Sequence, residues 1–264
     1  MESFQASKVH FYKYQAAGND FVLVDNREGK HSFTTPQIEK LCDRRFGIGA
    51  DGLISLDRDP KQDFKMVYFN SDGSEGFCGN GCRAIVHLAN RLGVIDKHAR
   101  FSAYDGDHHA DILSESIIKQ SLIDVSVIEQ RGEDYFINTG TEHNIRFVKD
   151  LAGYPVFEEG RKIRYSDGYK PKGTNADFVE VHQDQRVSFR IYERGVEAET
   201  WSSGSGATAC ALAVAKKYRR TSPIKLHAKG GVLEVEFKTR QDGTFHNIYL
   251  TGPVQLVFET TQVI

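Results

Sequence analysis

The sequence lacks the features that would place the protein in a membrane or on a nucleic acid. No apolar run approaches the ~20 residues that an α-helix needs to cross a bilayer. The first residues, Met1 to Gln5, contain no basic and apolar leader, so we expect the chain to act in the cytoplasm. A net charge of −2 gives no reason to expect a nucleic acid or an acidic membrane surface as partner.

Cysteine is scarce as well. There are four, Cys42, Cys78, Cys82 and Cys210, and Cys78 and Cys82 have no second pair with which to complete a metal site. We therefore expect no bound metal, and free thiols in a reducing compartment. The sequence does contain what a folded core requires. Its 264 residues are 39% hydrophobic and 27% charged, which suffices for one large domain or two of ordinary size.

The most informative stretch surrounds Cys78. A turn rich in Asn, Asp, Gly and Ser leads to this cysteine, and Gly-Asn-Gly and an apolar helical pattern (84–92) follow it. A thiol at a helix N-terminus meets free N–H groups and the positive end of the helix dipole, so its pKa should fall and its reactivity rise. The same N–H groups can bind a carboxylate. The alternative is a buried structural cysteine, the better assumption for a single isolated one.

A second stretch repeats this layout. Residues 203–207, Ser-Gly-Ser-Gly-Ala, correspond to residues 78–82 and also precede a helical run of small apolar residues. A second echo relates Asn-Asp-Phe at 19–21 to Asn-Ala-Asp-Phe at 175–178. Chance glycine turns can mimic one echo, but two in the same order indicate two tandem copies of one unit.

The strand and helix patterns predict an α+β fold of mostly antiparallel sheets with one central helix in each half. Both helices are unusually apolar, as a helix enclosed on all sides would be. We expect a first domain of residues 1–123 plus 252–264 and a second of residues 124–251, because the last strand (254–258) can return to the first half.

Three local predictions concern other segments. Thr35 and Pro36 predict the N-cap and first position of a short helix. Residues 123–127 alternate apolar and polar side chains, as a strand would, near the junction of the halves. The polar residues 158–175 predict a surface loop.

Six motifs together resemble those of the diaminopimelate epimerase family, from about Lys8 to the end of the chain. The motifs are Gly18-Asn19-Asp20-Phe21, Gly47-Ile48-Gly49-Ala50-Asp51-Gly52, Phe69-Asn70-x-Asp72-Gly73-Ser74-Glu75, Cys78-Gly79-Asn80-Gly81-x-Arg83, Asn175-Ala176-Asp177-Phe178 and Tyr192-Glu193-Arg194-Gly195. The resemblance implies a cofactor-independent amino-acid epimerase of two pseudo-symmetric units, each a sheet curled around a central helix, with the active site in the cleft between them. It also implies one cysteine from each unit, a thiolate base and an acid, on opposite faces of the substrate's α-carbon.

The resemblance also assigns site residues. The positions that match catalytic residues are Cys78, Ser203, His143 and Glu193. Those that match substrate-binding residues are Asn19, Asn70, Gly79, Asn80, Thr141, Asn175, Glu193, Arg194, Gly204 and Ser205, with Thr141 standing where the family commonly has asparagine. The backbones of 79–80 and 204–205 are helix N-termini that can stabilise charge developing on a substrate carboxylate.

Each assignment has a simpler alternative. Arg194 can bind a carboxylate with two parallel hydrogen bonds, but adjacent Glu193 and Arg194 also fit an exposed ion pair. The asparagines fit turn or capping roles. His143 either tunes the ionisation of the thiols or is a surface histidine.

The sequence departs from the family at Ser203, where a second catalytic cysteine belongs. Cys210 lies about two helical turns further on, too far to replace it. A serine hydroxyl is a far poorer acid and base than a thiol near neutral pH. Three explanations remain: an engineered Cys→Ser change, which the otherwise intact motifs favour; a natural and impaired enzyme; or a divergent reaction, such as elimination, that needs only Cys78.

The resulting hypothesis is epimerisation of L,L-diaminopimelate to meso-diaminopimelate in lysine and peptidoglycan precursor synthesis, impaired by Ser203. The alternatives are a racemase of the same fold for another amino acid, of histidine or proline type, and a non-catalytic amino-acid binder. The expected partner is a small diamino dicarboxylate, and a homodimer is the default assembly.

Overall fold

The computed structural model describes residues 8–264, and the chain divides into two compact units. The first contains residues 8–118 and 254–264, and the second contains residues 119–253. Among the described residues, no helix is long and apolar enough to cross a membrane.

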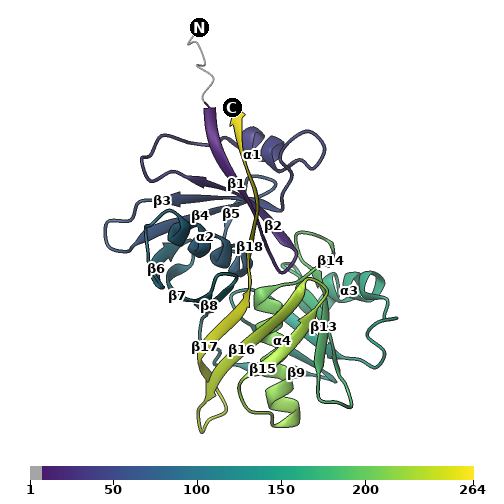
Figure 1. The fold of residues 1–264 in the computed structure, drawn as a ribbon. Helices are drawn as coiled ribbons and strands as arrows, with labels where there is room; N and C mark the ends of the chain where they lie inside the picture. Colours follow the sequence, from purple (N-terminus) through teal and green to yellow (C-terminus); the bar gives the residue numbers. More distant parts are fainter. Residues whose placement is uncertain (1–7) are drawn as a thin grey trace. The chain divides into compact units, whose positions relative to one another are not determined.

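The first unit is built around helix α2 (Figure 1). Its elements are β1 (Lys8–Ala16), β2 (Asn19–Asp25), α1 (Thr35–Cys42), β3 (Gly52–Asp57), β4 (Phe64–Asn70), β5 (Glu75–Gly76), α2 (Gly79–Arg91), β6 (His98–Ala103), β7 (Gly106–Ser114), the start of β8 (Ile117–Ser121) and β18 (Gln255–Val263). The C-terminal strand β18 pairs antiparallel with β1, so the chain ends beside the strand on which the described part begins.

The second unit is built around helix α4 (Figure 1). After β8 its elements are β9 (Ile128–Arg131), β10 (Asp134–Asn138), β11 (Glu142–Phe147), α3 (Val156–Arg164), the 3-10 helix η1 (Asp167–Tyr169), β12 (Asn175–Val181), β13 (Val187–Glu193), β14 (Ala198–Thr200), α4 (Gly204–Tyr218), β15 (Ile224–Ala228), β16 (Gly231–Thr239) and β17 (Phe245–Pro253).

The two units repeat one order of strand pairing. An antiparallel hairpin, β1–β2 or β10–β11, is followed by a strand parallel to its second member, β3 or β12. An antiparallel neighbour, β4 or β13, then pairs with a short strand before the central helix. After that helix, β6 or β15 returns parallel to the same neighbour. The prediction of an α+β fold of two pseudo-symmetric units is confirmed.

The same order corrects one of the two sequence echoes. Asn19 begins β2, whose counterpart is β11, whereas Asn175 begins β12, whose counterpart is β3. The prediction that residues 19–21 and 175–178 are equivalent segments of the two units is therefore wrong. Asparagine before an apolar strand is a common way to start a strand, and it does not by itself fix which strand follows.

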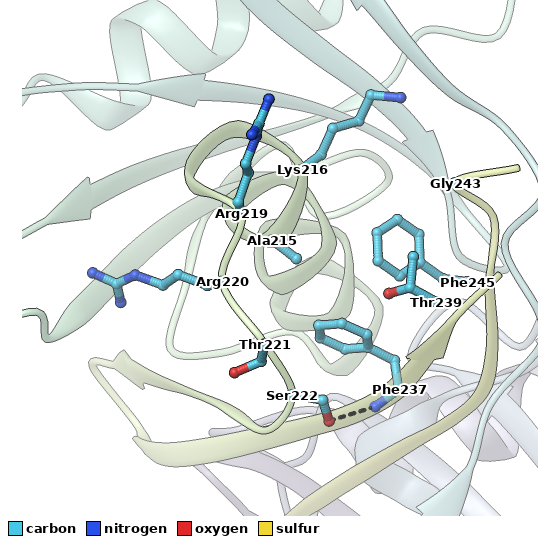
Figure 2. Close-up of a pocket in the computed structure, with 10 residues that line it drawn as sticks. All are labelled: Ala215, Lys216, Arg219, Arg220, Thr221, Ser222, Phe237, Thr239, Gly243 and Phe245. Atoms are coloured by element: carbon cyan, nitrogen blue, oxygen red, sulfur yellow. Dashed lines mark hydrogen bonds between the residues drawn. The ribbon is translucent and has the colours of Figure 1, made fainter. Parts of the chain in front are cut away.

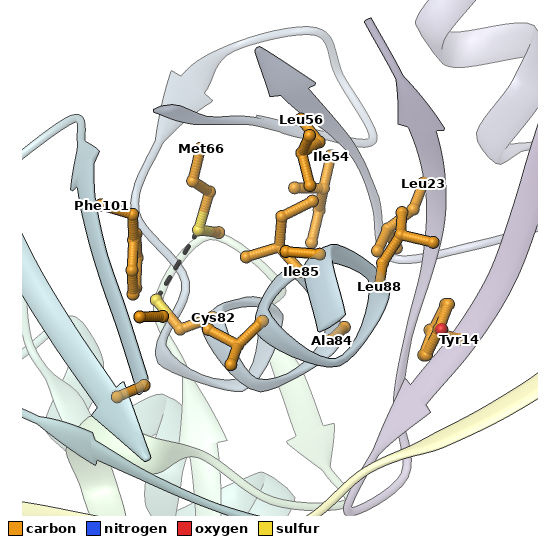
Figure 3. Packing of buried hydrophobic residues seen from close by; sticks show 14 of the residues in the cluster. Tyr14, Leu23, Ile54, Leu56, Met66, Cys82, Ala84, Ile85, Leu88 and Phe101 are labelled. Atoms are coloured by element: carbon orange, nitrogen blue, oxygen red, sulfur yellow. Dashed lines mark hydrogen bonds between the residues drawn. The ribbon is translucent and has the colours of Figure 1, made fainter. Parts of the chain in front are cut away.

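Both central helices are enclosed, as their apolar composition predicts. In α4 nearly every residue from Gly204 to Ala215 is buried. In α2, Ile85 and Leu88 pack with Ile54 and other side chains of the surrounding strands (Figure 3). Burial on every side holds each helix N-terminus in a fixed position relative to the strands of its own unit.

Three local predictions are corrected. The N-cap of α1 is Thr34 rather than Thr35, and its backbone N–H donates to the Gln37 side chain in a capping box. The segment 123–127 forms no strand, and only Val125 bridges to β17. Residues 158–175 are not a loop throughout, because α3 extends to Arg164 and η1 follows.

Helix α3 forms because its charges are ordered along the chain. Glu158 and Glu159 lie in the first turn, and basic residues lie in the last, so both ends match the helix dipole. Val156 and Ile163 supply the buried face. The polar composition indicated a loop, whereas the order of the charges indicates a helix.

Candidate active site

Cys78 and Ser203 are the N-cap residues of the two central helices. Their backbone angles nearly coincide, with φ −137° and ψ 111° at Cys78 and φ −136° and ψ 129° at Ser203. Gly79 and Gly204 are the first residues of α2 and α4. The first-turn N–H groups of a helix have no acceptor within the helix, so each tip can receive an anionic group.

In the first unit, two asparagines surround the Cys78 thiol. Sγ of Cys78 lies 3.6 Å from Oδ1 of Asn19, and Nδ2 of the buried Asn80 donates to the same oxygen at 3.2 Å. Nδ2 of Asn19 donates to Oδ2 of Asp51 at 2.5 Å. The carboxylate therefore fixes the orientation of the Asn19 amide, with its oxygen toward the thiol.

A buried arginine lies one turn further along α2. Arg83 is completely buried, and its Nη2 donates to Oδ1 of Asn80 at 2.8 Å. Burial lowers the pKa of Arg83 to about 10, so it still carries its charge near neutral pH. A fixed positive charge this close to Cys78 favours the thiolate.

Asp51 belongs to a charged network beneath Asn19. Arg44 binds both Asp20 and Asp51, and Nζ of Lys13 donates to Asp20 at 2.6 Å. Burial, followed by the charge of Asp20, raises the pKa of Asp51. Burial also acts to raise the pKa of Asp20, but the hydrogen bonds from Arg44 and Lys13 outweigh it and lower that pKa to about 2. The network ties the start of β2 to the loop before β3.

Asn70 is the last residue of β4 and stabilises the turn that follows. Its Nδ2 donates to the backbone oxygen of Ser74 at 3.2 Å and to the Ser74 hydroxyl at 3.0 Å. This is the turn role that asparagine often has. A substrate-binding role for Asn70 stays a prediction.

In the second unit, His143 lies at the centre of a buried polar cluster. Its Nδ1 lies 2.7 Å from Oδ2 of Asp177, and neither side chain is exposed to solvent. Its Nε2 lies 2.9 Å from the Thr141 hydroxyl and 3.1 Å from the Ser205 hydroxyl. The Ser203 hydroxyl lies 3.3 Å from that of Ser205. His143 is thus a buried residue, and the surface-histidine alternative is wrong.

Asn175 and Arg194 form a second set of contacts in the same unit. Oδ1 of Asn175 accepts from the backbone N–H of Arg194 at 2.8 Å, and its Nδ2 donates to the backbone oxygen of Glu142 at 2.9 Å. Arg194 also forms an ion pair with Glu142 at 2.8 Å, in which both side chains are a quarter exposed. Glu193, the last residue of β13, accepts a hydrogen bond from the Thr200 hydroxyl.

Among the residues of these clusters that were not assigned a role from the sequence are Asp51, Arg83, Glu142 and Asp177. Three of them, Asp51, Arg83 and Asp177, lie inside the motifs quoted above. For Arg83 and Asp177 the signal that was available is a charged residue inside a buried segment, because an ionised side chain is seldom buried without a partner.

Neither Cys78 nor Ser203 lines either of two cavities in the described residues. One of about 390 Å³ surrounds the C-terminal end of α4, between Ala215, Arg219 and Phe245 (Figure 2). Fifteen helical residues, roughly 22 Å, separate that end from Ser203. Another, of about 500 Å³, is lined by His98, Asp107 and other residues of β6 and β7. Among residues 8–264, no group of three or more His, Cys, Asp or Glu side chains could hold a metal ion.

Solved structures of other proteins share the fold of this chain. A phenazine biosynthesis protein of the PhzF family from Bacillus anthracis superposes with a TM-score of 0.79 at 13% identity, covering 98% of this chain and 100% of that one. A hydroxyproline epimerase from Agrobacterium vitis has a TM-score of 0.73 at 11% identity, covering 99% of this chain and 93% of that one. At these identities the likeness concerns the fold alone.

Sequence relatives identify the family. Residues 11–119 and 135–257 match the sequence model of diaminopimelate epimerase. The diaminopimelate epimerase of Flavobacterium psychrophilum is 47% identical over 253 residues, 95% of this chain and 98% of that protein. That of Chlorobaculum tepidum is 38% identical over 255 residues, 93% of this chain and 98% of that protein. The chain belongs to the diaminopimelate epimerase family and is an isomerase.

Proposed function

We propose that this enzyme interconverts L,L- and meso-diaminopimelate by moving a proton at one α-carbon, a step in the synthesis of lysine and peptidoglycan precursors. The observation that carries the proposal is the equivalence of Cys78 and Ser203 as N-caps of two enclosed helices in a repeated fold. Inversion at carbon needs a base and an acid on opposite faces, and two similar units can supply one each.

In the proposed reaction the Cys78 thiolate removes the α-proton. The carboxylate beside that carbon must hold the charge that develops, and first-turn N–H groups at Gly79–Asn80 and Gly204–Ser205 would stabilise it. Asn80 is already held by Arg83, so this tip needs little reorganisation. We propose that Asn19 orients the substrate beside the thiolate, because Asp51 fixes its amide.

The distant end of the substrate carries a second amino group and a second carboxylate. We propose that Arg194 binds this carboxylate, since its guanidinium can make two parallel hydrogen bonds. Asn70, Asn175 and Glu193 would bind the remaining polar atoms. Thr141, which lies 2.9 Å from Nε2 of His143, provides a hydroxyl next to the second helix tip.

Ser203 makes the second proton transfer slow. A hydroxyl gives up and takes up a proton far less readily than a thiol near neutral pH. Its oxygen caps α4 by accepting from the Gly206 N–H at 3.2 Å, so it stands where the family's second thiol is expected. The enzyme should therefore be impaired by Ser203 and not by the rest of its site.

The experiment is the Ser203→Cys variant, assayed by optical rotation and by entry of deuterium from heavy water into L,L-diaminopimelate. General acid–base groups contribute ~10²–10⁴-fold, so we expect at least a 100-fold gain in kcat. Cys78→Ala in both backgrounds is the matched control and should abolish turnover. If Ser203→Cys folds but exchanges no α-proton of diaminopimelate, while a panel including histidine and proline reveals another substrate, the proposed substrate is wrong. No exchange with any amino acid would favour a binding protein.

A further inference from the structure

A chain of hydrogen bonds leads from Ser203 into the interior of the second unit. The Ser203 and Ser205 hydroxyls lie 3.3 Å apart, and the Ser205 hydroxyl lies 3.1 Å from Nε2 of His143. Nδ1 of His143 lies 2.7 Å from Oδ2 of Asp177. Ser205 is partly exposed, whereas His143 and Asp177 are completely buried. The hydroxyl that the substrate would meet is thus connected to a titratable group that it cannot reach.

Asp177 is confined by its surroundings. A Cβ on Gly206 would lie only 2.6 Å from its Oδ1, so α4 packs directly against the carboxylate. The buried Cys210 thiol is close to it as well, since burial and then the charge of Asp177 raise the pKa of that thiol. A carboxylate only accepts hydrogen bonds, so Nδ1 of His143 carries the proton between them. Nε2 is therefore the nitrogen that exchanges protons, and it faces the hydroxyls.

We propose that Ser203 does not act alone: it exchanges its proton with His143 through the Ser205 hydroxyl, and Asp177 is the positioning residue that holds the imidazole for this role. The relay deepens the proposed function and rests on it. It explains how a residue with a poor acid–base group can still serve the second face of the α-carbon. In the relay the hydroxyls conduct the proton and the imidazole stores it.

Each step of the relay conserves protons and charge. The Ser203 O–H bond breaks as its proton joins the carbanion, while the Ser205 proton moves to the Ser203 oxygen. The Nε2 proton of the imidazolium moves to the Ser205 oxygen, which leaves His143 neutral and the substrate protonated. In the reverse direction every proton moves one place back. The relay requires the Ser205 hydroxyl to donate to the Ser203 oxygen, which also accepts from the Gly206 N–H, so that the Ser203 proton is directed away from both.

The test is a double-mutant cycle between Ser205 and Ser203. Ser205→Ala removes the hydroxyl but keeps the backbone N–H that would bind the carboxylate. In the Ser203 background the relay is broken, and we expect kcat to fall about 100-fold. In the Ser203→Cys background a thiol supplies its own proton, so the fall in kcat caused by Ser205→Ala should be at least tenfold smaller than in the Ser203 background. Non-additivity of this size between adjacent residues is what such a cycle measures.

Three further variants separate proton transfer from structure. Ser205→Thr keeps a hydroxyl and should restore most of the activity that Ser205→Ala loses. Asp177→Asn should also lower kcat more in the Ser203 background than in the Ser203→Cys background, because it removes the carboxylate that accepts from Nδ1–H of His143. Thr208→Val is the matched control, since the Thr208 hydroxyl is buried in the same helix and donates to the Gly204 backbone oxygen at 2.9 Å. It should affect both backgrounds equally.

The outcomes distinguish the relay from the proposed function. Equal losses for Ser205→Ala in the two backgrounds would overturn the relay and leave the epimerase intact. An active Ser203→Cys variant beside a Ser203 enzyme with no measurable turnover would also overturn it, because the relay would then supply nothing. Absence of epimerisation in both backgrounds would instead refute the proposed function.

Discussion

Cys78 and Ser203 have nearly the same backbone conformation at the tips of α2 and α4, yet their side chains make different contacts. The Ser203 oxygen accepts from the Gly206 N–H at 3.2 Å, whereas Sγ of Cys78 lies 3.6 Å from Oδ1 of Asn19. Ser203 thus contacts its own helix and the Ser205 hydroxyl. Cys78 contacts the Asn19 amide, which Asp51 holds in place. The repeat conserves this N-cap position, and the two units surround it with different side chains.

Isotope exchange should be faster than inversion for one stereoisomer of the substrate. A proton taken by Cys78 can exchange with heavy water and return to the same face before the slower Ser203 side delivers one. Deuterium content by mass spectrometry, compared with epimer content by chiral chromatography, measures the two rates. In the Ser203→Cys variant the rate of deuterium exchange and the rate of inversion should be nearly equal. Equal rates of exchange and inversion in the Ser203 enzyme would show that Ser203 is not the slow side.

Cys78 should be the only cysteine that reacts quickly with iodoacetamide in the native protein at pH 7. Cys42, Cys82 and Cys210 are buried, and burial raises the pKa of each thiol, to about 11 for Cys42. Peptide mass mapping should find one modified site, and Cys78→Ala should find none. Guanidinium-unfolded protein, in which all four react, is the control. Rapid native labelling of Cys210 would contradict the enclosed position of α4.

Asp20→Asn should destabilise the protein at pH 7 and much less at pH 2. The folded-state pKa of Asp20 is lowered to about 2, so its carboxylate stabilises the fold above its ordinary pKa near 3.8. That contribution is lost as the pH falls from about 4 to about 2. A shift of this size corresponds to about 2 kcal/mol in the free energy of unfolding. Urea titrations at several pH values measure it.

The exposed Glu133 provides the control for that measurement. Glu133→Gln should leave the unfolding free energy within about 0.5 kcal/mol at every pH. If Asp20→Asn loses as much stability at pH 2 as at pH 7, its ion pairs with Arg44 and Lys13 are not the source of the effect.

Gly206→Ala should lower both stability and activity. Its Cβ would lie 2.6 Å from Oδ1 of Asp177 and 2.9 Å from Cδ1 of Ile191, so Asp177 or α4 must move. Such overpacking costs about 1–3 kcal/mol. Gly160→Ala is the matched variant, because its Cβ would lie 2.3 Å from the Tyr192 Cβ in a helix without relay residues. Only Gly206→Ala should lose kcat per folded molecule. Equal specific activities would mean that Asp177 has no role in turnover.

Some errors of the sequence interpretation have a common origin. Polar residues in 158–164 form α3, and the echo between 19–21 and 175–178 joins strands that are not counterparts. Both readings relied on short patterns without their partners. A charged segment forms a stable helix when one of its faces packs against the core. Which strands of the two units correspond is decided by their pairing partners in the sheet.

The sequence alone determined the two glycine turns, the apolar helices that follow them and the equivalence of Cys78 with Ser203. These features are local, because an N-cap and a helix core are encoded within a few consecutive residues. Only the tertiary structure decided which groups surround each tip. His143 and Asp177 are 34 residues apart in the chain, and the parallel pairing of β11 with β12 brings them to 2.7 Å. Such a contact depends on strand register across a crossover, which no single stretch of sequence specifies.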